Sequence, residues 1–146
     1  MTTTDRRPAF GGIHHVAVTA SDVETSVAWY QRVFGMDRLP PRFPHHGPDA
    51  KGYAIVLVEP ETGMCLAVEH HPDNDGAGAD ERRCGVDHIS FAMISREHLD
   101  TWASRLDSLG IAHSGPVDAT DPMPYAALVF RDPDNVQLEL FSMDQG

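Results

Sequence analysis

The chain contains 146 residues with a mass of 16.0 kDa, which is the length of about one domain. Its 22 acidic residues outnumber its 11 basic residues, giving a formal net charge of −11. Such a negative field repels nucleic acid and anionic membrane surfaces, so neither is an expected partner. The apolar runs, such as Ala54 to Val58, are far shorter than the roughly 18 residues of a membrane span, and the N-terminus lacks the apolar stretch of a signal peptide. We therefore expect a cytoplasmic protein.

The sequence contains none of the common signatures of nucleophilic or nucleotide chemistry. Its two cysteines, Cys65 and Cys84, belong to no CxxC pair, so it encodes neither a disulfide framework nor a thiolate zinc cluster. No GxSxG elbow, phosphate loop or dinucleotide fingerprint occurs. Neither a serine or cysteine nucleophile nor a nucleotide cofactor is expected.

The first half of the chain follows the order strand, helix, strand, strand, strand. Alternating apolar residues predict the strands. Helical spacing follows Ser21 and Asp22, either of which can cap a helix that Gly35 ends. The expected elements are a strand from Ile13 to Thr19, a helix reaching Phe34, a poorly defined strand near Arg38 to Phe43, and hairpin strands from Tyr53 to Val58 and from Met64 to Glu69.

The second half repeats this order at a constant spacing. A distance of 73 residues separates His15 from His88 (88 − 15 = 73), Trp29 from Trp102, and the turn at Glu59 from the turn at Asp132. The expected elements are a strand from Val86 to Ala92, a helix that Ser95 caps and Gly110 ends, a poorly defined strand near Ile111 to Val117, and hairpin strands from Tyr125 to Phe130 and from Val136 to Phe141. A repeat of this kind predicts two βαβββ modules.

The two modules are expected to form one domain. Residues 1–9 are predicted to be a disordered tail, and residues 10–71 are predicted to form the first module. A linker rich in Gly and Asp follows over residues 72–84, because this stretch has no periodicity. The second module is expected over residues 85–143.

Three polar residues stand in predicted strands that are otherwise mostly apolar. His15 and His88 occupy equivalent positions in the first strand of each module, and Glu139 lies in the last strand. Because a buried carboxylate needs a partner, the three together favour a facial site for one divalent metal, Fe, Mn, Ni, Co or Zn. The alternative is that both histidines are hydrogen-bonded core residues and that Glu139 faces solvent.

Several segments together carry a resemblance to a known family. They are His15 to Val18, Trp29 and Tyr30 before Gly35, Asp87 to Phe91, and Phe130 to Asn135 leading to Leu138, Glu139 and Leu140. In these segments the chain resembles the vicinal-oxygen-chelate superfamily, which includes glyoxalase I, extradiol dioxygenases and bleomycin-resistance proteins. The resemblance implies an α+β fold in which two tandem βαβββ modules form an open, U-shaped, eight-stranded barrel-like sheet. It also implies a homodimer.

The resemblance implies four possible metal-ligand positions, of which His15, His88 and Glu139 match three. The fourth falls at Leu66 or Ala67, and neither side chain can bind a metal. Glu69 or His70 would have to reach from further along the strand. A three-ligand set also resembles fosfomycin-modifying enzymes, but so acidic a chain suits an anionic phosphonate poorly.

Aromatic and thioether side chains are candidates to line a ligand cleft, although each is also suited to the core. The predicted ligand-binding residues are His15, Phe43, Tyr53, Met64, Phe91, Met123 and Tyr125. The adjacent histidines His45 and His46 are interpreted as a polar loop. Of His14–His15 and His70–His71, only one member of each pair can face inward in a strand.

Two functions from different classes are consistent with the sequence. The first is a bleomycin-resistance-type binding protein that sequesters a small aromatic or drug-like molecule, such as an antibiotic, without turnover and with no cofactor. The second is a divalent-metal-dependent enzyme of the glyoxalase or dioxygenase type, in which Glu139 is the candidate catalytic residue. The missing fourth ligand, the apolar cleft and the negative charge favour the binding protein, which is the function we predict from the sequence. The intact His15, His88 and Glu139 set favours the enzyme, which is the alternative.

Overall fold

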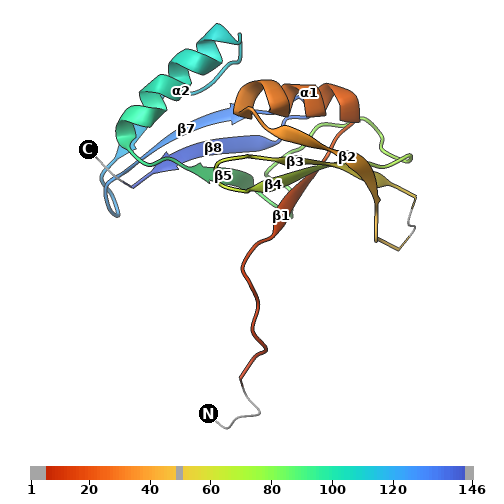
Figure 1. The fold of residues 1–146 in the computed structure, drawn as a ribbon. Helices are drawn as coiled ribbons and strands as arrows, with labels where there is room; N and C mark the ends of the chain where they lie inside the picture. The colour runs from red at the N-terminus through yellow and green to blue at the C-terminus, as the bar shows by residue number, and fades with distance from the viewer. Residues whose placement is uncertain (1–5, 49–50, 144–146) are drawn as a thin grey trace.

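The computed structural model describes residues 6–48 and 51–143, which form two βαβββ modules (Figure 1). The first module contains β1 (His15–Thr19), α1 (Val23–Phe34), β2 (Asp37–Pro44), β3 (Tyr53–Val58) and β4 (Cys65–His70). The second contains β5 (His88–Ala92), α2 (Arg96–Ser108), β6 (Val117–Ala119), β7 (Tyr125–Arg131) and β8 (Gln137–Ser142). The predicted α+β fold of two repeated modules is confirmed.

Each module folds its strands into one four-stranded sheet with the same topology. The strand orders are β1-β4-β3-β2 and β5-β8-β7-β6, so the eight strands form two sheets that are not closed into a barrel. In each sheet the first strand pairs in parallel with the last one, and the other pairings are antiparallel. Both helices lie on the same side of the sheets (Figure 1). No helix of the described residues is long and apolar enough to cross a lipid bilayer.

The sequence determines the ends of α1 through local contacts. The Asp22 carboxylate accepts a hydrogen bond of 3.0 Å from the Thr25 backbone N–H, which satisfies one free donor of the first turn. Gly35 ends the helix with a φ of 66°, a left-handed conformation that favours glycine. Ser95 occupies the equivalent position before α2, but its side chain makes no capping hydrogen bond.

One predicted strand differs from the structure. The strand expected near residues 111–117 occupies only Val117–Ala119, and His113 forms one isolated bridge with Phe130. The Ser114 hydroxyl accepts the Val129 N–H at 2.9 Å, and Gly115 has a φ of 70°. A side chain therefore takes the place of a backbone acceptor, and the chain turns before pairing can continue.

Two described segments lie outside the modules, one before β1 and one between β4 and β5. Residues 6–9 are exposed without regular structure, and residues 1–5 of the predicted tail lie outside the described residues. Between β4 and β5 there is neither helix nor strand. The bidentate pair of Glu81 with Arg131, at 2.8 Å for both contacts, attaches this linker to the second sheet.

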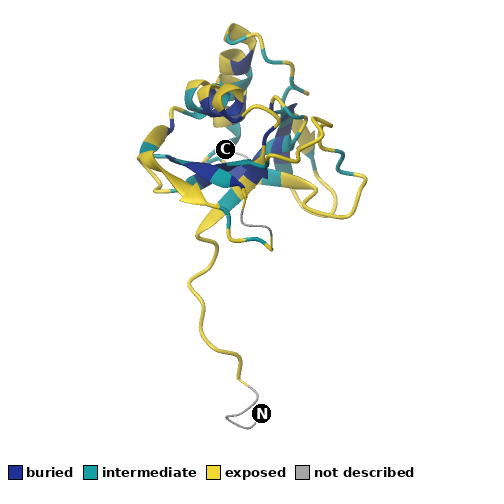
Figure 2. Cartoon of the chain, turned by 90° about the vertical axis from the view of Figure 1, so that its right-hand side faces the viewer, coloured by how far each residue is buried: buried dark blue, intermediate teal, exposed yellow. Residues whose placement is uncertain are grey.

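The core lies between the helices and the sheets and is continuous across the two modules (Figure 2). The Phe34 ring lies 4.7 Å from Phe91, 5.6 Å from Trp102 and 6.1 Å from Phe130, measured between centroids, and all three partners belong to the second module. The buried Tyr30 hydroxyl donates a hydrogen bond of 2.7 Å to the Asp132 carboxylate. These contacts make the two modules one packed unit.

Candidate metal centre

The helix-free side of each sheet carries the polar residues that the sequence singled out. We call this side the open face, because α1 and α2 cover only the opposite side. Side chains alternate along a strand, so residues two apart share a face. The open face of the first sheet includes His15, Ala17, Thr19, Cys65, Ala67 and Glu69, and that of the second includes His88, Ser90, Gln137, Glu139 and Phe141. The exposure pattern of β1 and β5 is identical, with the first, third and fifth residues exposed.

His88 and Glu139 form a preorganised pair on the second open face. The His88 Nε2 atom lies 3.7 Å from Glu139 Oε1. On the other side of the ring, His88 Nδ1 lies 2.6 Å from Asp87 Oδ1, so the carboxylate accepts the Nδ1 proton and leaves Nε2 free to bind an ion. The Ser90 hydroxyl donates a hydrogen bond of 2.8 Å to Glu139 Oε1 and orients it.

This pair fits a divalent metal ion. Imidazole nitrogen and carboxylate oxygen bind first-row metals at about 2.0–2.2 Å, so neighbouring ligand atoms of one ion lie about 3–4 Å apart. The 3.7 Å distance between His88 Nε2 and Glu139 Oε1 falls in this range. Each ligand also has an outer partner that fixes its orientation, Asp87 for the imidazole and Ser90 for the carboxylate.

His15 does not join this pair within one chain. It lies on the first sheet, in register with Cys65, and its Nδ1 atom is 2.9 Å from the Nδ1 atom of His14. Within residues 6–48 and 51–143, the ligand atoms of His15 do not come within 4.8 Å of those of both His88 and Glu139. Two of the three predicted ligands are thus brought together, and the third is on the other open face.

The strand register locates the fourth ligand position. Ser90 pairs with Glu139 in the second sheet, and Ala17, its equivalent in the repeat, pairs with Ala67 in the first. Ala67 therefore occupies the position that corresponds to Glu139, and its methyl group cannot bind a metal. Leu66, the other candidate, faces the helix and is buried.

The structure separates the predicted ligand-binding residues into two groups. Phe43 and Tyr125 lie on the open faces, where Tyr125 stacks on Phe141 with centroids 5.4 Å apart. Met123 lies in the loop before β7 and is 49% exposed. These three residues remain available to a ligand.

The other group corrects the prediction, because these side chains point to the helix-covered side. Phe91 is buried against Phe34, and Met64 packs against the same core. The Arg42 guanidinium lies over the Tyr53 ring, with its carbon 4.3 Å from the ring centroid. Strand alternation places Phe91 on the opposite side of β5 from His88 and Ser90. It places Tyr53 on the same side of β3 as the buried Ile55 and Leu57, so residue type alone was not enough to identify a ligand-binding side chain.

Sequence reasoning missed a cluster at the far end of the first open face. His45, Glu69 and His71 each offer one ligand atom, and these atoms lie within 4.8 Å of one another. The prediction treated His45 as part of a polar loop and Glu69 as too distant along its strand. The sequence signal was two pairs of adjacent histidines, His45–His46 directly after β2 and His70–His71 at the end of β4. These two strands lie on either side of β3 in the sheet.

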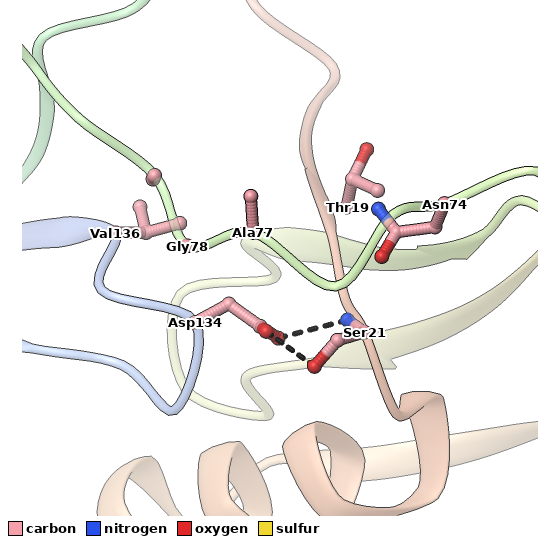
Figure 3. A pocket seen from close by; sticks show the side chains of 8 residues that line it. Thr19, Ser21, Asn74, Ala77, Gly78, Asp134 and Val136 are labelled. Carbon is pink, nitrogen blue, oxygen red and sulfur yellow. Dashed lines mark hydrogen bonds between the residues drawn. The ribbon is translucent and has the colours of Figure 1, made fainter.

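A surface pocket lies elsewhere, where the linker passes the end of β1 (Figure 3). It is lined by Thr19, Ser21, Asn74, Ala77, Gly78, Ala79, Asp134 and Val136. Ser21 donates hydrogen bonds to Asp134 of 3.0 Å from its backbone N–H and 2.5 Å from its hydroxyl. No predicted site residue lines this pocket, and its polar contacts join the first module to the second.

Comparisons with known proteins agree on one family. The model of the Glyoxalase/Bleomycin resistance protein/Dioxygenase superfamily matches residues 12–140. A domain of that description from Frankia sp. EAN1pec superposes with a TM-score of 0.79 at 28% identity, covering 94% of this chain and 96% of that one. The fosfomycin resistance protein FosX from Listeria monocytogenes, solved with Mn(II) and sulfate, shares the fold with a TM-score of 0.63 at 17% identity, covering 92% and 93% of the two chains.

A curated relative is longer than this chain. MhqA of Bacillus subtilis, whose name describes a ring-cleaving dioxygenase, is 25% identical over 132 residues, which is 90% of this chain. The chain spans 40% of the length of MhqA.

Proposed function

Because the chain belongs to the glyoxalase/bleomycin resistance protein/dioxygenase superfamily, we propose that it is a divalent-metal-dependent enzyme acting on a small molecule with two neighbouring oxygen atoms. One observation carries this proposal: Asp87 and Ser90 orient His88 and Glu139 so that His88 Nε2 lies 3.7 Å from Glu139 Oε1, a distance suited to two ligands of one ion. A protein that only enclosed an apolar compound would need neither the ligands nor their outer partners.

The residues of this chain would divide the work as follows. His88 and Glu139 would hold the ion, and Asp87 would keep the His88 proton on Nδ1. When bound, such an ion acts as a Lewis acid that polarises substrate oxygen atoms. Glu139 has a second oxygen that Ser90 does not engage, so this carboxylate can also accept a substrate proton.

A second copy of the chain completes the proposed site. The open faces of one chain carry exposed small and apolar residues next to the ligands, such as Ala17 beside His15 and Ala92 beside Ser90. Placing the first sheet of one copy over the second sheet of the other would cover both faces and bring His15 to His88 and Glu139. The proposed enzyme is therefore a homodimer with ligands from both subunits.

The surroundings of the ligands favour an aromatic substrate. Tyr125 and Phe141 stack beside Glu139 on the second open face, and Phe43 is exposed on the first. Flat rings pack well on such side chains. With a net charge of −11, the protein favours a neutral or cationic compound over a phosphonate. A catechol-like compound combines a flat ring with two neighbouring oxygen atoms.

The second candidate function is sequestration of a drug-like aromatic compound without turnover. Ala67 favours it, because this residue removes the fourth ligand position. The two functions differ in what happens to the bound compound. Incubation of the metal-loaded protein with catechols, 2-oxoaldehydes and aromatic antibiotics, followed by mass analysis, separates them. Metal-dependent loss of a catechol or oxoaldehyde supports the enzyme, and tight binding with every compound recovered unchanged supports sequestration.

Subunit mixing tests the shared site directly. We expect H15A and E139Q each to lose the ion held by His88 and Glu139 when purified alone. Refolding the two variants together should restore about a quarter of the metal sites, because half of the dimers are mixed and each contains one intact site. No recovery on mixing would contradict a shared site, and full metal content in E139Q alone would contradict the proposed ligand set. The variants E97Q and H98A on α2, away from the open face, are matched controls and should keep their metal.

A further inference from the structure

We propose that His45, Glu69 and His71 form a second divalent metal site, distinct from the one that contains His88 and Glu139. It would bind a first-row transition ion such as Zn²⁺. The inference rests on the first sheet alone and does not depend on the proposed function.

The backbone places the three side chains together. His45 pairs with Gly52 through a hydrogen bond of 3.0 Å from its N–H, next to the pair of Pro44 and Tyr53. Tyr53 in turn pairs with His70, so His71 follows on the other side of Gly52. His45, Gly52 and His71 thus form a row one residue beyond the adjacent ends of β2, β3 and β4. Glu69, two residues before His71, lies on the same face.

Gly52 allows the two imidazoles to meet. Residues two strands apart are separated by about 10 Å along the sheet. The rings of His45 and His71 nevertheless approach to 4.6 Å between centroids, in an edge-to-face arrangement. A Cβ at Gly52 would lie 3.3 Å from both His45 Cβ and His71 Nδ1, and it would clash with the His70 carbonyl oxygen. The missing side chain leaves the space into which both rings lean.

Glu69 supplies an independent indication of a ligand. Its Oε2 atom is buried and has no hydrogen-bond partner among the described residues. A buried carboxylate oxygen without a partner is costly, and proteins normally satisfy such an atom with a hydrogen bond, a cation or a metal. The described neighbours that could satisfy it include two imidazoles with metal-binding nitrogens.

The donor set is suited to zinc, cobalt or nickel. Two imidazoles and one carboxylate are a common set for these ions, with other positions left for water. The ligand atoms lie within 4.8 Å of one another, and around one tetrahedral ion they would be about 3.3 Å apart. Small side-chain rotations are enough to close this difference.

Binding would change one hydrogen bond that the structure contains. The Gly47 N–H donates to His45 Nδ1 at 3.1 Å. If neutral His45 binds an ion through Nε2, its proton is on Nδ1, which then cannot accept a hydrogen bond. If His45 binds the ion through Nδ1, the lone pair of that atom is used by the ion. Either mode breaks the hydrogen bond from Gly47, so the Gly47 amide reports on the site.

The cluster is separate from the family site on the same face. Glu69 pairs with Thr19, whereas His15 pairs with Cys65, four residues earlier along both strands. At about 3.3 Å per residue, this separation is about 13 Å. An ion held at His45, Glu69 and His71 would join β2 to β4 across β3, at the point where the linker begins.

Cobalt titration of the full chain tests the proposal. The H88A/E139Q double variant removes the other pair of ligands, so that any remaining stoichiometric binding is assigned to the first sheet. We expect this background to bind about one Co²⁺ per chain, with the visible absorption of low-coordinate cobalt. Adding E69Q, H45A or H71A should weaken binding at least tenfold. Added H46A or H70A, the neighbouring histidines, should leave it unchanged.

Each result decides the proposal. Zn²⁺ should shift the Gly47 amide resonance in the H88A/E139Q background and leave it in place when E69Q is added. Equal cobalt affinity with and without E69Q, or equal losses from H46A and H71A, would overturn the site. Thermal melts verify that each variant is folded. If E69Q does not fold, H45A, which retains Glu69, takes its place in the comparison. If the parent protein binds an ion at His45, Glu69 and His71 but none at His88 and Glu139, the result counts against the proposed function and leaves this inference intact.

Discussion

Replacing Tyr30 by Phe should remove one hydrogen bond from a buried contact between the modules. The Tyr30 hydroxyl donates to Asp132 Oδ2 at 2.7 Å, and both residues are buried. Asp132 Oδ1 is engaged separately by the backbone N–H groups of Asp134 and Val136, each at 2.9 Å. The substitution therefore leaves Oδ2 of a buried carboxylate without its donor, while the shape of the ring is kept.

The expected loss can be estimated from this geometry. A hydrogen bond to a charged group contributes about 1.5–3 kcal/mol, so Y30F should lower the free energy of unfolding by about 2 kcal/mol. For a protein of about 150 residues this corresponds to a melting temperature lower by roughly 4–8 °C. Y125F is the matched control, since the Tyr125 ring lies on the open face, and its effect on stability should stay within about 0.5 kcal/mol.

The penalty should also depend on pH. Burial raises the pKa of Asp132 above its ordinary value, although the hydrogen bond from Tyr30 opposes the shift. A carboxyl group whose pKa is raised by folding favours the folded state when protonated, and this contribution is lost as the pH rises through the folded pKa. Y30F removes a donor that favours the ionised form and raises the folded pKa further. Its penalty should thus be full above that pKa and smaller once Asp132 is protonated.

Urea unfolding of Y30F and the parent at about pH 7.5 and about pH 4.5 measures both effects. Equal stability of the two proteins at about pH 7.5 would refute the assigned hydrogen bond. A penalty of the same size at both pH values would refute the role of the Asp132 charge.

Three further predictions concern helix ends and assembly. D22A should lower the free energy of unfolding by about 1 kcal/mol, because Asp22 accepts a hydrogen bond from the Thr25 N–H. S95A should have a smaller effect, because the Ser95 side chain makes no capping hydrogen bond, and chemical denaturation compares the two variants. G35A should lower the free energy of unfolding by about 1 kcal/mol because of the φ of 66° alone, since a methyl group at this position meets no atom within 4 Å. An unchanged midpoint of chemical unfolding would contradict this prediction. Sedimentation equilibrium should show a dimer, and A17R, which places a charge on an exposed position of the open face, should yield folded monomer; a monomeric parent at micromolar concentration would exclude the shared site.

Local sequence signals predicted most of the fold. Asp22 and Gly35 act within one helical turn of the residues they cap, so the ends of α1 were predictable. The strand near residues 111–117 was not, because Ser114 bonds to Val129, which is distant in the sequence. Periodicity locates strands reliably only where the backbone of the neighbouring strand supplies the partners.

For the candidate site, the sequence predicted residues that the structure brings together only in part. The repeat correctly related His15 to His88, yet it does not show that the two residues lie on different sheets. The parity of Phe91 within its strand could have shown that it points to the helix. The cluster of His45 with Glu69 depends on register across three strands, which one sequence does not contain.

The contacts between the modules do not follow the repeat that relates them. Phe34, which touches three aromatic rings of the second module, corresponds to position 107 (34 + 73 = 107), where Asp107 is exposed and bonds to His113 at 2.8 Å. Tyr30 corresponds to Ala103, which has no hydroxyl to donate. The two halves have therefore become complementary rather than interchangeable. A chain built from two identical first halves would keep each βαβββ unit but lose the aromatic contacts that hold the halves together.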